Sequence, residues 1–173
     1  MNIRKLHIKG YKSVADLTLR DVSPLLVFAG ANGSGKSNIV DALAFLGAVV
    51  KFGALQARTQ FGGFSQIHCF KYRKEQRTTI SFSMVLELAE SLYDYTISIN
   101  SLDKAPQIAE TLKVDGVQMI DRRGNDTKVR LTENDGLQSL PDYPKDMTAL
   151  MLMGQSPLYA FLANIKVFRF DPL

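Results

Sequence analysis

The sequence predicts an α/β fold in which a strand, a glycine-rich loop and a helix are joined to an antiparallel sheet. The apolar run 25–29 ends at a loop rich in glycine, and apolar residues at helical spacing follow over 38–50. From Thr78 onward, apolar and polar residues alternate with a period of two, which is typical of half-buried strands. These observations predict both helices and a sheet within one domain.

The composition is that of one ordinary globular domain. The 173 residues are 46% hydrophobic and 22% charged, which is enough to bury a single core. Cys69 is the single cysteine and cannot form an internal disulfide, and His68 beside it gives only two candidate ligands, too few for a structural metal site. No signal peptide or membrane span is evident, so we expect a cytoplasmic protein without a membrane partner.

The net charge is mildly basic. A charge of +4 at pH 7 and a pI near 9.2 make a nucleic-acid partner plausible without requiring one. The densest basic run is 71–74, with Arg77 just beyond it. A solvated loop and a contact with DNA explain this run equally well.

The elements before and directly after the loop follow from their patterns. Imperfect alternation predicts strands over 3–11 and 17–22, and the uninterrupted apolar run 25–29 predicts a strand buried on both faces. Asp41 is expected in the first turn of the helix over 38–50, where a negative charge favours the helix dipole.

The rest of the chain predicts a meander followed by helices. Glycines break any period over 52–70, which predicts an irregular segment with about one helical turn. Hairpin signals stand at 115–116 and 124–126. The predicted strands are 80–88, 93–99, 110–114, 117–122 and 127–132. Helical composition follows at 147–153 and 158–165, and a last strand is expected at 166–170.

The loop has the G-x-x-x-x-G-K-S spacing of a P-loop, from Gly30 to Ser37. Small residues let successive backbone N–H groups turn inward around phosphate oxygens, and the helix that follows adds its positive end. Lys36 places a full charge on the terminal phosphates, and the Ser37 hydroxyl suits magnesium. The sequence therefore predicts ATP and Mg²⁺ as ligands. The predicted contacts in the loop are Gly30, Asn32, Gly33, Ser34, Gly35, Lys36, Ser37 and Asn38.

Two stretches carry a family resemblance. Residues 3–13, IRKLHIKGYKS, and residues 30–43, GANGSGKSNIVDAL, resemble the N-terminus of RecF/SMC-type ABC ATPases. Residues 108–116, 122–124 and 167–172 look like bacterial ATPases related to OLD proteins. The resemblance implies that 1–173 is the N-terminal lobe of an ABC ATPase-like P-loop NTPase with an added antiparallel β-sheet. It divides the chain into a P-loop core at 1–50, an antiparallel subregion at 76–134 and the start of a helical part at 145–173.

The resemblance also implies roles for single residues. Lys12 matches the basic residue that the family places near the nucleotide after its first strand. Gln155 resembles the Q-loop glutamine, which would hold magnesium and orient water, although an ordinary exposed glutamine fits that position equally well. Gln66 is a weaker candidate. No other catalytic residue is assigned.

The sequence departs from the family pattern in three motifs. A Ser-Gly-Gly signature, an Asp-Glu pair after an apolar strand and a late switch histidine are not found in these 173 residues. Because water activation depends on those groups, we expect this chain to bind nucleotide better than it hydrolyses it. We also expect it to be the N-terminal portion of a longer protein whose second lobe supplies them.

Three functions are compatible with these motifs. The first is an ATPase head that forms a homodimer with ATP between protomers and acts in DNA repair or phage defence with DNA or a nuclease partner. The alternatives are the ATPase subunit of an ABC transporter, for which Tyr11 is the only plausible residue to stack on adenine, and a nucleotide-sensing scaffold without turnover.

Overall fold

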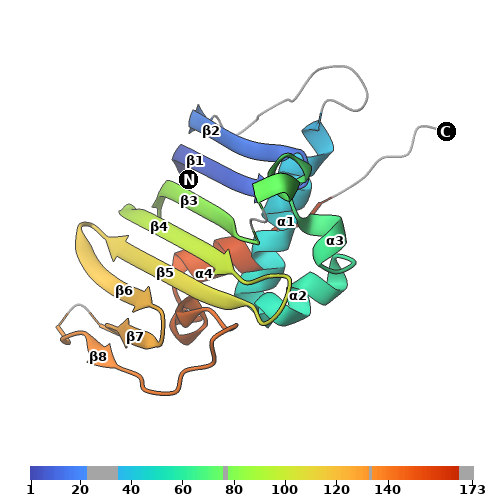
Figure 1. The fold of residues 1–173 in the computed structure, drawn as a ribbon. Helices are drawn as coiled ribbons and strands as arrows, with labels where there is room; N and C mark the ends of the chain where they lie inside the picture. Colours follow the sequence, from blue (N-terminus) through green and yellow to red (C-terminus); the bar gives the residue numbers. More distant parts are fainter. Residues whose placement is uncertain (23–34, 76–77, 133, 168–173) are drawn as a thin grey trace.

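One curved antiparallel sheet forms the framework of the protein (Figure 1). The computed structural model describes residues 1–22, 35–75, 78–132 and 134–167. In these described parts of the chain, eight strands lie in the order β2-β1-β3-β4-β5-β6-β7-β8, and each neighbouring pair is antiparallel. Their bounds are β1 (Asn2–Tyr11), β2 (Val14–Val22), β3 (Ile80–Leu88), β4 (Ser91–Asn100), β5 (Gln107–Val114), β6 (Val117–Arg123), β7 (Asp126–Val129) and β8 (Gln138–Ser139).

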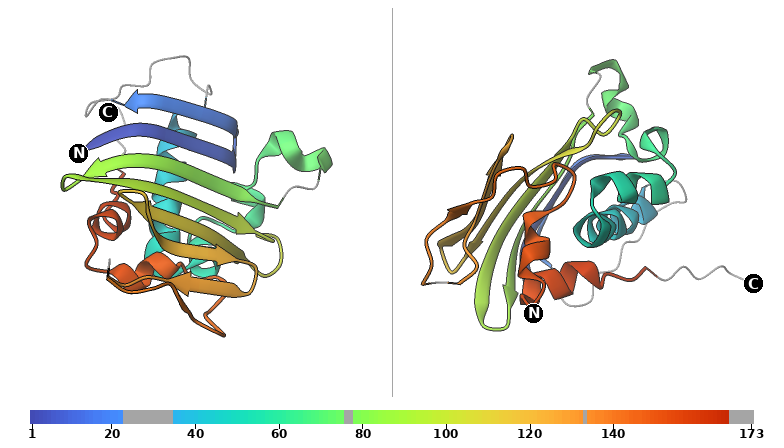
Figure 2. Two further views of the ribbon diagram at one scale, coloured as in Figure 1. Left: turned by 90° about the vertical axis from the view of Figure 1, so that its left-hand side faces the viewer. Right: turned by 90° about the horizontal axis from the view of Figure 1, so that it is seen from below.

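The helices α1, α2 and α4 lie on the concave face of this sheet (Figure 2). Alternation along the strands explains this arrangement, since β3 and β4 turn large apolar side chains toward the helices. The opposite face of the same strands carries half-buried serine and threonine. The helical elements are α1 (Lys36–Phe52), α2 (Ala54–Gln60), α3 (Phe64–Ile67), α4 (Pro157–Ala163) and the 3₁₀ helices η1 (Phe70–Glu75) and η2 (Ala149–Met153).

Helix α1 is the central element of the core. Its fully buried side chains include Phe45, Leu46 and Val49, which recur at helical spacing. Gly47 permits α4 to approach closely, because a Cβ atom there would lie 2.8 Å from the carbonyl oxygen of Leu162. The helix therefore packs between the sheet and α4.

A buried polar cluster joins residues 143–150 to the sheet. The Glu110 carboxylate accepts hydrogen bonds from the Tyr95 hydroxyl at 2.9 Å and from the backbone N–H groups of Ala149 at 2.6 Å and Leu150 at 3.1 Å. Arg122 donates to the carbonyl oxygens of Met147 and, at 2.7 Å, Pro144. Burial raises the pKa of Glu110, while these hydrogen bonds and Arg122 oppose the shift.

The segment 52–70 differs from the prediction. It contains two helices, α2 and α3, where about one turn was expected. Gly53 and Gly63 cap these helices and do not interrupt them, and both have a positive φ that glycine adopts without strain. A glycine-rich composition therefore marked the boundaries of short helices.

Other boundaries also differ. β7 ends at Val129, earlier than the predicted 132, and the two-residue β8 was not predicted. The predicted strand 25–29 and residues 168–170 of the last predicted strand lie outside the described residues. The sheet is continuous across the segments 1–50 and 76–134, because β1 pairs directly with β3. Within the described residues, no helix combines the length and apolar character that crossing a membrane would require.

Candidate nucleotide-binding site

The N-terminal end of α1 contains the described part of the P-loop motif. Gly35 precedes the helix with a φ of +85°, and the helix begins at Lys36. Lys36 and Asn38 are half-buried and Ser37 is exposed. The first amides of a helix have no acceptors within it, so this end attracts an anion. The other predicted contacts, Gly30, Asn32, Gly33 and Ser34, lie outside the described residues.

The turn between β1 and β2 packs against this end of α1. The Ser13 hydroxyl oxygen accepts a hydrogen bond from the Asn38 side-chain amide at 2.8 Å. A Cβ atom on Gly35 would lie only 2.5 Å from the same oxygen. Glycine at 35 is thus required both by the left-handed backbone and by the closeness of Ser13.

Lys12 lies on the same turn and pairs with α1. Its ammonium forms an ion pair with Oδ2 of Asp41, and the Tyr11 hydroxyl donates to that oxygen at 2.8 Å. Lys12 therefore contacts the helix that follows the P-loop motif. A direct contact between Lys12 and a nucleotide stays a prediction.

Two expectations about these residues were wrong. Asp41 does not lie in the first turn of α1, which has no acidic residue, and its carboxylate binds Tyr11 and Lys12. Tyr11 is fully buried, and its ring centroid lies 5.5 Å from that of Phe45. It therefore has no exposed face on which an adenine could stack.

The turn and the start of β2 are also held by α3 and η1. The Lys12 backbone N–H donates to the carbonyl oxygen of Ile67 at 2.9 Å, and the Tyr72 hydroxyl donates to that of Ala15 at 3.1 Å. A small pocket of about 200 Å³ lies here and is bordered by Gly35, Ser13 and Lys71 among others. Lys71, from the basic run 71–74, thus lies close to the described end of the motif.

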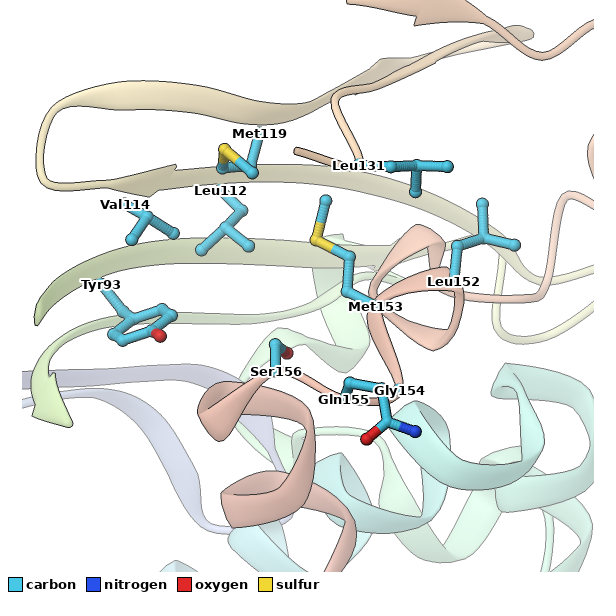
Figure 3. Close-up of a pocket in the computed structure, with 10 residues that line it drawn as sticks. All are labelled: Tyr93, Leu112, Val114, Met119, Leu131, Leu152, Met153, Gly154, Gln155 and Ser156. Carbon is cyan, nitrogen blue, oxygen red and sulfur yellow. The ribbon is translucent and has the colours of Figure 1, made fainter. Parts of the chain in front are cut away.

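Gln155 lies in a different part of the protein. It is exposed in the turn between η2 and α4 and lines an open pocket of about 670 Å³ (Figure 3). The other walls are mainly apolar side chains from the strands β4 to β6 and from η2, and neither Lys12 nor residues 35–38 line it. The structure therefore does not bring Gln155 together with Ser37, and its Q-loop role stays a prediction. Gln66 is an exposed residue of α3.

His68 has local hydrogen-bond partners, and Cys69 is a buried free cysteine. Nδ1 of His68 lies 3.1 Å from the carbonyl oxygen of Phe64, and Cys69 is buried. Among the residues described, no group of three or more His, Cys, Asp or Glu side chains is arranged to hold a metal ion.

Ser13 and the pairing role of Asp41 were not predicted from the sequence. Both residues stand in the stretches that carried the family resemblance, close in sequence to residues that were predicted to contact the nucleotide. Ser13 follows Lys12, and Asp41 is three residues beyond Asn38. Residues three apart on a helix share a face, so the spacing of Asn38 and Asp41 was the sequence signal that both could contact the same neighbouring segment.

Comparisons with known proteins match this region of the chain. Residues 1–138 match the family described as AAA ATPase domain. The chain is 49% identical over 47 residues to the chromosome partition protein Smc of Halothermothrix orenii, which is 27% of the chain and 4% of that protein. It is 44% identical over 64 residues to the Smc protein of Mycobacterium tuberculosis, covering 36% of the chain and 5% of that protein. It is 48% identical over 48 residues to structural maintenance of chromosomes protein 2 of Gallus gallus, covering 27% of the chain and 4% of that protein.

Proposed function

This chain belongs to the AAA ATPase domain family, and on that premise we propose that it binds ATP with Mg²⁺ as part of an SMC- and RecF-like ATPase. The match and the Smc relatives confirm the resemblance to RecF/SMC-type ATPases. One observation carries the proposal of a nucleotide site. Lys36 and Ser37 of the P-loop motif begin α1 directly after the left-handed Gly35.

Each described residue of the motif has a proposed role. Lys36 places its ammonium on the β- and γ-phosphates, and the exposed Ser37 hydroxyl is a ligand of Mg²⁺. The first amides of α1 bind phosphate oxygens, because they point out of the helix along its dipole. We keep Gln155 as a proposed second contact to Mg²⁺, which requires its turn to approach Ser37 when nucleotide is bound.

The role of the whole protein is a wider proposal. The chain covers about a twentieth of the length of the Smc relatives. We propose a cytoplasmic ATPase that forms a homodimer with ATP between protomers and acts with DNA or a nuclease partner in DNA repair or phage defence. The names of the relatives, which concern chromosomes, and the net charge of +4 support a DNA partner.

A nucleotide-sensing scaffold is the second candidate. It would use the same P-loop motif to bind ATP and would not require turnover. ATP turnover by the full-length protein, measured with and without DNA, separates the two functions. Turnover that increases with DNA supports the ATPase, and ATP binding without turnover supports the scaffold.

Replacing Lys36 with alanine is expected to weaken Mg²⁺-ATP binding about 10- to 100-fold, because a charge-assisted contact to phosphate is lost. Isothermal titration calorimetry of the folded protein measures this change. Lys51→Ala is the matched control, since Lys51 is exposed in the last turn of the same helix, and it should bind like the wild type. Equal affinity of the Lys36→Ala variant and the wild type would contradict the proposed site.

A further inference from the structure

We propose that Asp41 is a positioning residue of the nucleotide site, which holds the β1–β2 turn against the first turns of α1. This inference rests on the proposed function, because it concerns how the same site is kept in shape. Asp41 was not among the predicted contacts to the nucleotide, and Tyr11 was considered only for stacking on adenine. Their part in the site comes from the geometry of the turn.

The burial of Asp41 is the first argument. Asp41 is 8% exposed, and a buried carboxylate is unfavourable unless it is paired and hydrogen-bonded. Asp41 satisfies this requirement through Lys12 and Tyr11, which donate to the same oxygen. Both donors lie at the end of β1 or in the turn that follows, so the carboxylate ties this turn to the helix.

The spacing along α1 is the second argument. Asn38 and Asp41 are three residues apart and lie on one face of the helix. Asn38 binds Ser13, and Asp41 binds Lys12 and Tyr11, so one helix face contacts three consecutive residues. Because the turn is attached to α1 at two positions along the helix axis, it cannot shift along the helix without breaking one of these contacts.

The closeness of the turn to the motif is the third argument. The Ser13 hydroxyl is near enough to Gly35 to exclude a Cβ atom there. A shift of the turn therefore changes the surroundings of the residue from which the helix begins, where the proposed phosphate contacts lie. Through this packing, Asp41 influences nucleotide binding without touching the nucleotide.

The ion pair also restricts Lys12. In the described geometry, the ammonium of Lys12 is engaged by a helix residue, and its ring contact is with Tyr11 at 5.4 Å from the centroid. Lys12 therefore acts mainly as the partner of Asp41. This differs from a direct contact between Lys12 and phosphate, and the two roles predict different results.

A double-mutant cycle with Mg²⁺-ATP distinguishes these roles. Lys12→Met and Asp41→Asn should each weaken binding about 3- to 10-fold, and the double variant should bind no more weakly than either single variant. Lys12→Arg, which can still pair with Asp41, should retain the wild-type affinity. If Lys12→Met weakened binding by the same factor in the Asp41→Asn variant as in the wild type, the proposal would be overturned. Lys12 would then act independently of Asp41.

A second readout does not depend on nucleotide. Hydrogen exchange at the amide of Lys12, which donates to Ile67, should accelerate at least about 10-fold in Asp41→Asn as the turn opens locally. Asp94→Asn, an exposed change on β4, should leave this exchange rate unchanged. Unchanged exchange in Asp41→Asn would overturn the inference. If the wild type did not bind Mg²⁺-ATP but Asp41→Asn still accelerated the exchange, the proposed function would be contradicted and the positioning role of Asp41 would stand.

Discussion

Replacing Glu110 with alanine is expected to lower the free energy of unfolding by about 3–5 kcal/mol, the typical cost of removing one partner from a buried charged cluster. The change leaves the Tyr95 hydroxyl and the amides of Ala149 and Leu150 without an acceptor. It also removes a carboxylate whose negative charge favours the buried guanidinium of Arg122. Urea unfolding followed by circular dichroism measures the loss.

A control on the same sheet gives the scale of this effect. Glu87 on β3 forms an exposed ion pair with Arg4, and Glu87→Ala should cost less than about 1 kcal/mol. If Glu110→Ala were no more destabilising than Glu87→Ala, the buried cluster would not be a major source of stability.

The pH dependence of Glu110 has a definite sign. Because its pKa is raised by burial, the folded protein keeps a proton that the unfolded chain loses above about pH 4.5, the ordinary pKa. This group therefore lowers the free energy of unfolding as pH rises from about 4.5 through its folded pKa. Glu110→Gln cannot titrate, so its unfolding free energy should fall less over this range than that of the wild type.

Replacing Gly10 with alanine is expected to lower the free energy of unfolding by about 2–5 kcal/mol, from a strained backbone and a steric clash together. Gly10 has a φ of +85°, and a Cβ atom there would lie 2.6 Å from the carbonyl oxygen of Thr79. The neighbouring strand must shift to accept the methyl group, because the clashing atom belongs to the backbone. Chemical denaturation of both proteins measures the change.

Gly116 offers a matched control for Gly10. Its φ is +82°, but a Cβ atom there meets nothing within 4 Å. Gly116→Ala therefore introduces the backbone strain without the clash, and it should lower the free energy of unfolding by about 1–2 kcal/mol. Gly10 directly precedes Tyr11 and Lys12, so Gly10→Ala should also weaken Mg²⁺-ATP binding, whereas Gly116→Ala should not. Equal losses of stability in the two variants would show that the contact with Thr79 has no energetic cost.

Periodic segments of the fold could be predicted from the sequence, and glycine-rich segments could not. The alternation over β3 and β4 depends on one buried face, and hairpin signals such as Asp115-Gly116 mark the turns between strands. Between Phe52 and Phe70, glycines serve as caps of short helices, which a search for an unbroken period cannot detect. The pairing of β1 with β3 is a tertiary contact that no local pattern encodes.

The candidate site shows the same division between motif and tertiary contact. Lys36 and Ser37 could be selected because backbone and magnesium chemistry restrict the residues of a P-loop. The positions of Asp41 and Ser13 depend on how the β1–β2 turn packs on α1, so a general helix-dipole argument gave the wrong role for Asp41. Burial of Tyr11 depends likewise on α1, because Phe45 covers its ring.

The strand order of the sheet has a consequence for the folding pathway. From β3 to β8, each strand pairs with the next in the chain, so these hairpins can form through short-range encounters. β1 must instead reach β3 across residues 12–79 of the chain, which carries a larger entropy cost of closure. We therefore expect the meander to collapse first and the β1–β2 hairpin to join last. The N-terminal end of α1 would then acquire its neighbours from the β1–β2 turn only in the final step of folding.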